Sequence, residues 1–299
     1  MRFIRSNILR DHTTATETKK IDLPINPLSH LIVSMDAYNA TDEATLAELL
    51  AFINKISVTH NGNTIFSMES EDHYGQNCYL YGNRPVLLGK LATDNYHRNL
   101  SLIVPFGRKI FDPNECFPQT KKGELTLTVD TTVPSTSADE STLNIEAVEL
   151  PGANPQRYLK SIMNTVSSPG ATGDNDYDLP IGNDIVAMLI RMTTWPGASS
   201  HTYGVDMAKV LIENQEYGYA AARAQCLAGD LIHHYDTQHG AIAAQGAIQP
   251  ASMVILDYDP RRNDEFLLHT AGKGSAKLRM EMGVDEATYV SVLELVKAA

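Results

Sequence analysis

The densest group of metal-ligating side chains in the sequence is a histidine cluster, with His233, His234 and His239 placed around Asp236. Imidazole nitrogens are common zinc ligands, and a carboxylate could complete such a site. The spacing does not match the HExxH motif of zinc peptidases. We therefore interpret these histidines as solvated loop or interface residues, and a weak metal site among them stays an open alternative.

Asp174, Asp176 and Asp178 alternate along the chain like the start of a calcium-binding loop. An EF-hand loop also requires glycine at its sixth position and glutamate at its twelfth. Here those positions hold Leu179 and Ile185. The pattern favours a turn that leads into a strand, and isolated weak calcium binding is left open.

Paired acids occur in two further segments, residues 69–72 and 257–259. Two carboxyl groups hydrolyse a glycosidic bond only if they face one cleft, which a sequence does not show. The chain has no G-x-S-x-G elbow and no P-loop, and neither Cys78 nor Cys116 has a nearby base. A cupin metal site is not indicated, because no His-x-His occurs and two adjacent histidines would point to opposite faces of a strand. The sequence predicts no catalytic, cofactor-binding or metal-binding residue.

The composition describes a globular chain of 299 residues, 43% hydrophobic and 20% charged, which can bury a sizeable core. This length allows one large domain or two smaller ones. The net charge of −12 argues against a protein that wraps nucleic acid. Cys78, Cys116 and Cys226 form no CxxC pair, so we expect reduced thiols rather than a zinc ribbon or a disulfide framework.

Residues 1–6 carry charge but no apolar segment, so they do not resemble a secretory signal. The longest apolar run, near 185–190, has the length of a strand and is too short to span a membrane. We expect a soluble protein that is made in a cytoplasm and stays or is assembled there.

The elements that must position these side chains occur twice along the chain. Asp22-Leu23-Pro24-Ile25 recurs as Asp178-Leu179-Pro180-Ile181, about half the chain later. Four more pairs follow in the same order: 2–6 with 157–161, 101–104 with 252–255, 125–127 with 278–280, and 148–150 with 293–295. We predict two copies of one domain, residues 1–152 and 153–299, joined by the linker-like segment 151–155.

Short alternating or apolar runs predict mostly β-structure. Residues 56–60 alternate and are followed by Asn61-Gly62, the strongest short-range signal for a hairpin. Further strands are predicted at 31–35, 100–104, 125–129, 143–148, 187–192, 253–256, 266–269, 277–282 and 289–296. Many short strands separated by turns favour a sandwich or barrel.

Helix signals are few. Residues 41–43 could cap a short helix that carries Leu46, Leu49, Leu50 and Ile53. A second helix is expected after Gly204, with an apolar stripe formed by Val205, Ala208 and Leu211. The Ala-rich stretch 216–230 fits either a helix or a strand.

The duplicated β-rich domain, the hairpin at 56–65, the strand–Pro-Phe-Gly element at 100–107 and the strand at 123–129 carry a family resemblance. Together they resemble the double jelly-roll major capsid proteins of tailless icosahedral viruses, which include small lipid-containing bacteriophages and, as a large relative, adenovirus hexon. The resemblance implies an all-β fold of two tandem eight-stranded jelly rolls with short helices in loops. Many large members carry long loops that form towers. This chain has no room for such loops, so we expect a minimal version of the fold.

The same resemblance implies a viral structural protein without catalysis or cofactor. It would form homotrimers that tile an icosahedral shell, within a virion assembled in the host cytoplasm. Its partners would be further copies of itself, vertex (penton) and minor capsid proteins and an internal membrane, without sequence-specific contact to nucleic acid. The basic residues of the N-terminal region could touch anionic lipid or a neighbouring subunit, or could be solvated charges of an ordinary strand: Arg2, Arg5, Arg10, Lys19 and Lys20.

The matching Arg157 and Lys160 would lie at the junction of the two domains. Two other functions compete with the capsid interpretation. A bicupin-like, metal-dependent enzyme would bind stoichiometric metal, and a carbohydrate-binding β-sandwich pair would expose aromatic platforms. The single Trp195 forms no such cluster and is expected in a loop, an interface or the core.

Overall fold

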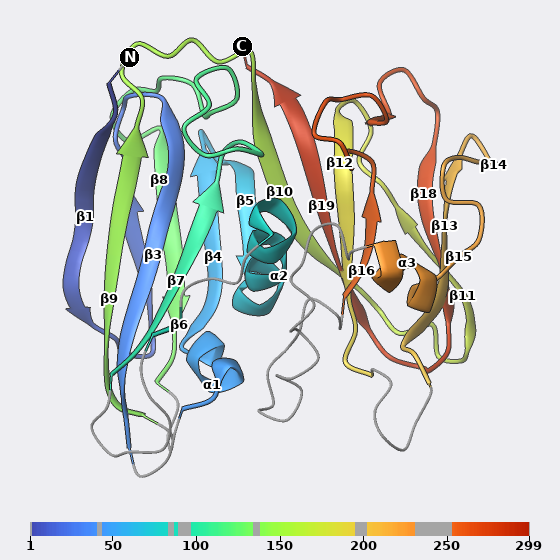
Figure 1. Cartoon of the computed structure of the whole chain (residues 1–299), viewed down its shortest axis with the longest axis horizontal. Helices are drawn as coiled ribbons and strands as arrows, with labels where there is room; N and C mark the ends of the chain where they lie inside the picture. The colour runs from blue at the N-terminus through green and yellow to red at the C-terminus, as the bar shows by residue number, and fades with distance from the viewer. Residues whose placement is uncertain are drawn as a thin grey trace.

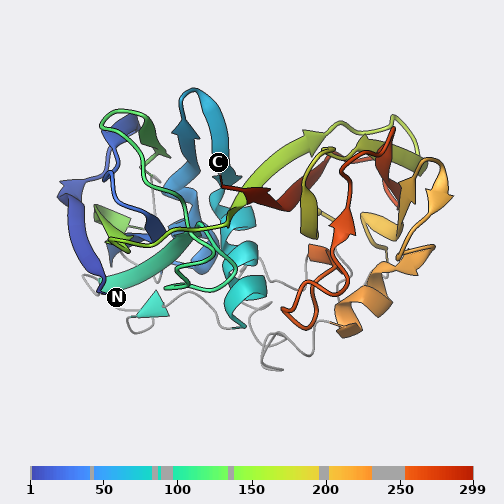
Figure 2. The ribbon, with the colours of Figure 1, turned by 90° about the horizontal axis from the view of Figure 1, so that it is seen from above.

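The computed structural model of the chain describes residues 2–40, 44–82, 87–88, 97–133, 138–194, 202–230 and 253–298. These residues form two β-sandwiches that stand side by side (Figure 1). We call the part up to strand β9 the first half and the part from strand β10 the second half. A view from above shows one helix, α2, between the two sandwiches (Figure 2).

The described residues of the first half form nine strands and two helices: β1 (Ile4–Thr13), β2 (Glu17–Asp22), β3 (Leu28–Asn39), α1 (Leu46–Ala51), β4 (Ile53–His60), β5 (Asn63–Glu69), α2 (Ser70–Tyr81), β6 (Leu87–Leu88), β7 (His97–Pro105), β8 (Leu125–Thr131) and β9 (Ala138–Glu149). The described part of the second half contains β10 (Arg157–Val166), β11 (Gly173–Asp178), β12 (Asp184–Arg191), β13 (Val205–Ile212), β14 (Gln215–Glu216), β15 (Ala222–Arg223), α3 (Ala224–Asp230), β16 (Met253–Asp257), β17 (Leu268–His269), β18 (Ala276–Met282) and β19 (Thr288–Lys297).

The two halves share one strand order. The first half pairs β1-β9-β3-β7 in one sheet and β2-β8-β4-β5 in the other, and the second half pairs β10-β19-β12-β16 and β11-β18-β13-β14. In each half the opening strand pairs antiparallel with the closing strand, β1 with β9 and β10 with β19. Two facing antiparallel sheets in this order are the arrangement expected of a jelly roll. The predicted all-β architecture is therefore observed.

Equivalent hydrogen bonds confirm the internal repeat. The Asn26 side chain donates to the Glu149 carboxylate at 2.7 Å, and the Asn183 side chain donates to Glu294 at 2.8 Å. Each asparagine follows the repeated Asp-Leu-Pro-Ile motif, and each glutamate lies near the end of the last strand of its half. Residues 151–155 connect β9 and β10, and the domain boundary after residue 152 stays a prediction.

One pairing joins the two halves into a continuous sheet. β5 and β10 are parallel neighbours, with Phe66 opposite Ser161 and Ser67 opposite Ile162. The sheet therefore runs β16-β12-β19-β10-β5-β4-β8-β2 across both sandwiches. This pairing covers a strand edge in each half that would otherwise present free backbone groups.

Strands β12, β16 and β19 of the β10-β19-β12-β16 sheet are buried on both faces, whereas the edge strand β10 alternates between buried and half-exposed residues. Met188 and Ile190 of β12 belong to the core of the second half, whereas Ala187 and Leu189 belong to the core of the first. All residues of β12 after Asp184 are buried, which explains the continuous apolar run in the sequence. A strand with only one buried face alternates instead, as β3 does.

The Asn61-Gly62 hairpin is confirmed. Both residues have positive φ, 48° and 82°, as a two-residue turn between β4 and β5 requires. Helix α1 is also present, but it begins after Thr45, whose hydroxyl caps the backbone N–H of Glu48. The expected cap at 41–43 lies outside the described residues, and Ile53 opens β4 instead of extending the helix.

The helix expected after Gly204 is wrong, because Val205–Ile212 is strand β13. Val205 and Ala208 are both buried, and the pairing of β13 with β18 shifts register between Val205 and Met207. This bulge places two core residues three positions apart in a strand, which imitates helical spacing. In the undecided stretch 216–230, residues 224–230 form α3.

Helix α2 has no signal in the apolar pattern. Ten of its twelve residues are buried, including Asp72, His73, Gln76 and Asn77, so its polar and apolar residues do not separate into two faces. The Asn77 side chain donates to the Ile103 carbonyl at 2.8 Å and accepts from the Ile103 N–H at 2.7 Å. The helix is thereby attached to β7, and it lies against the second half (Figure 1).

We predict that Leu189→Ala destabilises both halves together, by about 2–5 kcal/mol. The shorter side chain would leave a cavity between the doubly buried strand β12 and the core of the first half. Denaturant unfolding followed by fluorescence and circular dichroism should give one transition at lower denaturant. Leu211→Ala, at a half-exposed position on β13, is the matched control and should cost below about 1 kcal/mol. Two separate transitions, with only one shifted, would contradict the shared core.

Candidate functional site at the junction of the two halves

The junction is built from a tight loop after β7. The Phe106 carbonyl accepts from the Leu159 N–H of β10 at 2.9 Å. At Gly107 a Cβ atom would lie 2.1 Å from the backbone oxygen of Glu115, so only glycine allows the two arms of this loop to approach. This close approach brings Arg108 beside Glu115. The Pro-Phe-Gly element thus positions the first charged residue of the junction.

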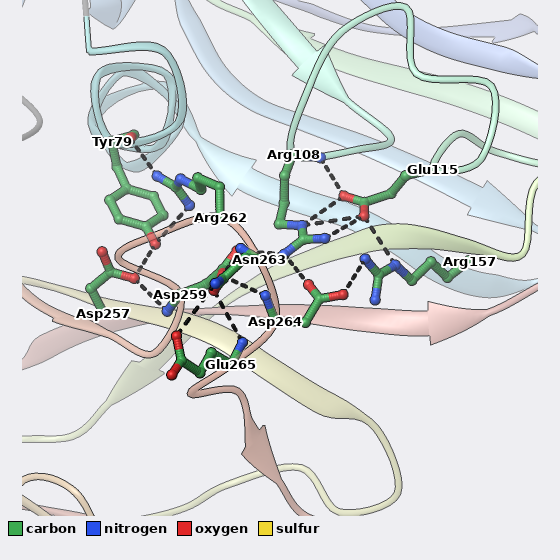
Figure 3. A network of polar contacts seen from close by, with 10 residues as sticks. All are labelled: Tyr79, Arg108, Glu115, Arg157, Asp257, Asp259, Arg262, Asn263, Asp264 and Glu265. Atoms are coloured by element: carbon green, nitrogen blue, oxygen red, sulfur yellow. Dashed lines mark hydrogen bonds and ion pairs between the residues drawn. The ribbon is translucent and has the colours of Figure 1, made fainter.

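Arg108 joins the two halves through buried ion pairs (Figure 3). Its side chain is 7% exposed and donates to Glu115 at 2.7 Å, from the same loop. It also donates to Asp259 and, at 2.6 Å, to Asp264, both from the loop after β16. We call Arg108, Glu115, Arg157, Asp259 and Asp264 the Arg108 cluster.

Arg157, the first residue of β10, completes this cluster. Its Nε atom donates to Glu115 at 3.0 Å, and its Nη2 atom is 2.7 Å from Asp264. The prediction that Arg157 lies at the junction is confirmed. Lys160 lies on the same strand, directly before the Ser161 that is opposite Phe66 of the first half, and its side chain pairs with Glu294 of β19 at 3.0 Å.

Three members of the Arg108 cluster, Arg108, Glu115 and Asp264, are held in their charged forms. Burial acts to lower the pKa of Arg108, but the surrounding carboxylates outweigh it and hold that pKa well above its ordinary value. Burial acts to raise the pKa values of Glu115 and Asp264, yet the two arginines lower both. A buried charge without a partner costs several kcal/mol, so each half supplies counter-ions that the other half requires.

A tyrosine connects α2 to the same loop of the second half. The Tyr79 hydroxyl donates to Asp257 at 2.6 Å. Arg262 donates to the Tyr79 hydroxyl and to its carbonyl, each at 3.0 Å, and its guanidinium lies 4.4 Å from the ring centre. Burial raises the pKa of Tyr79 well above its ordinary value, so the hydroxyl remains a hydrogen-bond donor.

Arg191, at the end of β12, makes a second set of ion pairs with the start of α2. It donates to Asp72 at 3.0 Å, to Glu71 at 2.5 Å and to Glu69 at 2.6 Å. The other side of its guanidinium lies 3.8 Å from the ring centre of Tyr289. We call these five residues the Arg191 cluster.

Three carboxylates compete for one guanidinium in the Arg191 cluster. Burial raises the pKa of Asp72 to about 6, and the neighbouring Glu69 and Glu71 add to this, whereas Arg191 opposes it. Burial raises the pKa of Glu71 as well. The Oδ1 atom of Asp72 is buried without a hydrogen-bond partner. This side of the junction carries excess negative charge.

A polar cavity of about 340 Å³ lies beside the Arg108 cluster. Its lining includes Lys109, Asp112 and Asn114 from the first half and Arg262 from the second. The cations and carboxylates of the Arg108 cluster that reach it are already paired with each other. Within the described ranges, no three His, Cys, Asp or Glu residues are arranged to hold a metal ion. The geometry is that of a rigid joint between two sandwiches.

The aspartates that resemble a calcium loop lie on the exposed face of β11. Asp176 accepts from Arg279 of β18 at 2.5 Å, and this hydrogen bond lowers the pKa of Asp176. Asp174 lies 3.5 Å from Arg279, and Asp178 lies 3.7 Å from Lys277. Cross-strand ion pairs thus occupy these carboxylates. His233, His234 and His239 lie outside the described residues, as does Trp195.

Both acidic segments that the sequence singled out are at the junction. Carboxylates of residues 69–72 form ion pairs with Arg191. In the segment 257–259, Asp257 accepts a hydrogen bond from Tyr79 and Asp259 forms an ion pair with Arg108. Sequence reasoning missed the two arginines. A usable signal was present for one of them, because an arginine at the end of a doubly buried apolar strand must find a carboxylate.

The basic N-terminal residues are placed mostly on strands. Arg5 on β1 pairs with Glu146 of β9, and Arg10 lies 3.1 Å from Asp11. Lys19 and Lys20 lie on β2. These positions agree with an ordinary strand, and contact with lipid or a neighbouring subunit stays a prediction.

Solved structures of viral capsid proteins resemble the whole chain. The STIV major capsid protein, from Sulfolobus turreted icosahedral virus, has a TM-score of 0.72 at 12% identity and is matched over 99% of this chain and 97% of its own. The major capsid protein P2 of bacteriophage PM2 has a TM-score of 0.64 at 13% identity and is matched over 100% of this chain and 98% of its own. The PBCV-1 virus capsid has a TM-score of 0.67 at 8% identity and is matched over 98% of this chain and 93% of its own. The chain has the double jelly-roll fold.

At these identities the similarity establishes the fold. No protein-family model matches the sequence, and a search of the curated proteins finds no match. The solved structures that this chain resembles give no support to the bicupin alternative. In the part of the chain that the structure describes, no helix is long and apolar enough to cross a membrane.

We predict that Gly107→Ala destabilises the protein by about 1–3 kcal/mol, because the added methyl meets backbone that cannot move without displacing Glu115 from Arg108. Thermal unfolding checks this. Gly229→Ala is the control, since its Cβ would meet nothing within 4 Å and alanine favours a helix. Equal stability of both variants would refute the tight approach at Gly107.

Asp72→Asn should weaken the pH dependence of folding. The folded protein holds the Asp72 proton up to about pH 6, whereas an unfolded aspartate releases it near its ordinary value of 3.8. The free energy of unfolding therefore falls as pH rises through this window, by up to about 3 kcal/mol. Urea unfolding between pH 4 and 7 should show a flatter profile for Asp72→Asn. The control Asp178→Asn, at an exposed position of β11, should keep the wild-type slope of unfolding free energy against pH. The same slope for the wild type and both variants would contradict the prediction.

Proposed function

We propose that this chain is the major capsid protein of an icosahedral virus, a structural subunit of the virion without catalytic activity. The observation that supports this most strongly is coverage. Three solved viral capsid proteins are matched over 93% to 98% of their own length, so the similarity extends over both jelly rolls and their connection. A single shared sandwich would carry much less weight, because many functions use that architecture.

The joint between the halves supports a role as a building block. The shared sheet and both arginine clusters hold the two sandwiches side by side, so one chain presents two similar wedges in a set orientation. Three chains around a threefold axis would present six wedges, which is a pseudo-hexagonal tile. Closed rings of this kind form through head-to-tail interfaces when the rotation between neighbours closes.

The proposed partners follow from this role. Copies of the chain would form homotrimers, and the trimers would contact each other, vertex (penton) proteins and minor capsid proteins. An internal membrane would lie beneath the shell, which is assembled in the host cytoplasm. The net charge of −12 would keep free trimers soluble and offers no general basic lining for nucleic acid.

Light scattering on the purified chain tests the proposal, with negative-stain electron microscopy of the same fraction. We expect a mass three times that of the 32.8 kDa chain and particles with a hexagonal outline. A monomer or a simple dimer at every concentration and salt tested would overturn it. Metal analysis of the same fraction would then decide whether a bicupin-like enzyme has to be reconsidered.

A further inference from the structure

We propose that Asn61 is a site of spontaneous chemical modification, at which the side-chain amide is lost and an aspartate or an isoaspartate takes its place. Asn61 is the one asparagine of the sequence that is followed by glycine. It lies with Gly62 at the exposed tip of the β4–β5 hairpin. The inference does not depend on the capsid role, because it concerns the chemistry of a turn within one chain.

The reaction needs only the chain and water. The backbone nitrogen of Gly62 attacks the side-chain carbonyl carbon of Asn61 and gives up its proton. The carbon–nitrogen bond of the side-chain amide breaks, so ammonia leaves and a cyclic imide remains. Water then adds to either carbonyl of the imide and opens the ring. Opening on one side gives aspartate, and opening on the other gives isoaspartate, in which the backbone runs through the side chain. The net change exchanges one water for one ammonia.

Both reacting groups are accessible. A Cβ atom at Gly62 would meet nothing within 4 Å, so the described parts of the chain do not shield the peptide between the two residues. Asn61 is exposed, and among the described residues its side-chain nitrogen makes a single contact, 3.3 Å long, with the Nε2 atom of His60. One long hydrogen bond holds the amide only weakly.

Rotation of one peptide plane brings the reacting atoms together. The φ values of Asn61 and Gly62, 48° and 82°, are those of a type I′ turn, in which the first residue has ψ of about 30°. In that conformation the Gly62 nitrogen points away from the Asn61 side chain. In a type II′ turn the first residue has ψ of about −120°, and the nitrogen lies on the side of the side chain. The second residue must then change from positive to negative φ, which glycine does at little cost.

The hairpin permits this rotation because the moving peptide is outside the strand ladder. His60 and Asn63 are the cross-strand partners that close the turn, and the peptide between Asn61 and Gly62 lies beyond them. Types I′ and II′ both connect the strands of a two-residue hairpin, so β4 and β5 stay paired during the change. The reactive geometry is therefore reached without unfolding.

The second half contains a turn of the same kind in which the asparagine is protected. Glu213 and Asn214 connect β13 to β14 with positive φ values of 51° and 65°. Here asparagine is the second residue of the turn, so the nitrogen that would attack belongs to Gln215. Gln215 pairs with Ile212 and closes the hairpin. Rotation of this peptide would break the ladder, which keeps the nitrogen away from the Asn214 side chain.

The modification would alter the hairpin tip and leave the joint between the halves in place. Either product carries a new carboxylate beside His60, and isoaspartate also adds a carbon atom to the backbone of the turn. The pairing of β5 with β10 involves Phe66 and Ser67, away from the tip. We therefore expect the modified chain to stay folded and to separate from the original chain as a more acidic form.

Ageing of the purified full chain tests the proposal. The protein is incubated at neutral pH and digested, and tandem mass spectrometry locates the modified residues, with isoaspartate identified by enzymatic methylation. We expect isoaspartate to form at Asn61 at least about tenfold faster than at Asn214 in the same sample. Isoaspartate is the diagnostic product, because direct hydrolysis of the amide gives aspartate alone.

The variant Gln215→Gly separates the position in the turn from the sequence. It gives Asn214 a glycine as its successor, yet the strand ladder should still protect this residue, so Asn61 should remain the faster site. In urea both asparagines of this variant should react at similar rates, which is the positive control for the chemistry. Asn61→Gly keeps a residue that tolerates positive φ and should abolish the acidic form.

Two results would overturn the proposal. One is a folded chain that forms no isoaspartate at Asn61 while the urea-unfolded chain does. The other is an equal rate at Asn61 and Asn214 in folded Gln215→Gly, since the position within the turn would then have no effect. Neither result bears on the capsid proposal, which light scattering on fresh protein tests separately.

Discussion

The structure depends on one sheet, β10-β19-β12-β16, in which β12, β16 and β19 are buried on both faces. It is a wall of the second sandwich and also part of the core of the first. Because of this, neither half buries its apolar surface completely without the other. The parallel pairing of β5 with β10 then sets the position of this wall relative to the first half, so that the two sandwiches stand side by side.

Charged side chains at the rim of this wall orient the two halves. Arg108 and Arg191 are both nearly buried, and each finds carboxylates on the opposite half. Such pairs add little net stability, because removing ions from water costs about as much as their attraction returns. Their effect is on the orientation of the two halves, since any other orientation would leave a buried charge without a partner. We infer that the clusters define the angle between the jelly rolls.

The two halves share a strand order but differ in what covers them. The outer face of the β10-β19-β12-β16 sheet is apolar and packs against the first half, whereas the outer face of the β1-β9-β3-β7 sheet carries half-exposed polar side chains such as Ser34 and Ser101 among the described residues. The repeat of strand order therefore does not extend to the surroundings of the two equivalent sheets.

The sequence by itself determined the duplication, the all-β class and most strands, because these depend on local periodicity and on turn residues such as Asn61-Gly62. It also determined which segments are acidic. Only the tertiary structure decided that Val205 and Ala208 belong to a bulged strand, that α2 exists, and that residues 69–72 and 257–259 are counter-ions of Arg191 and Arg108. The physical reason is that a bulge against a partner strand, the burial of polar side chains and ion pairs across more than 100 residues all depend on what lies opposite in space, which local sequence patterns do not contain.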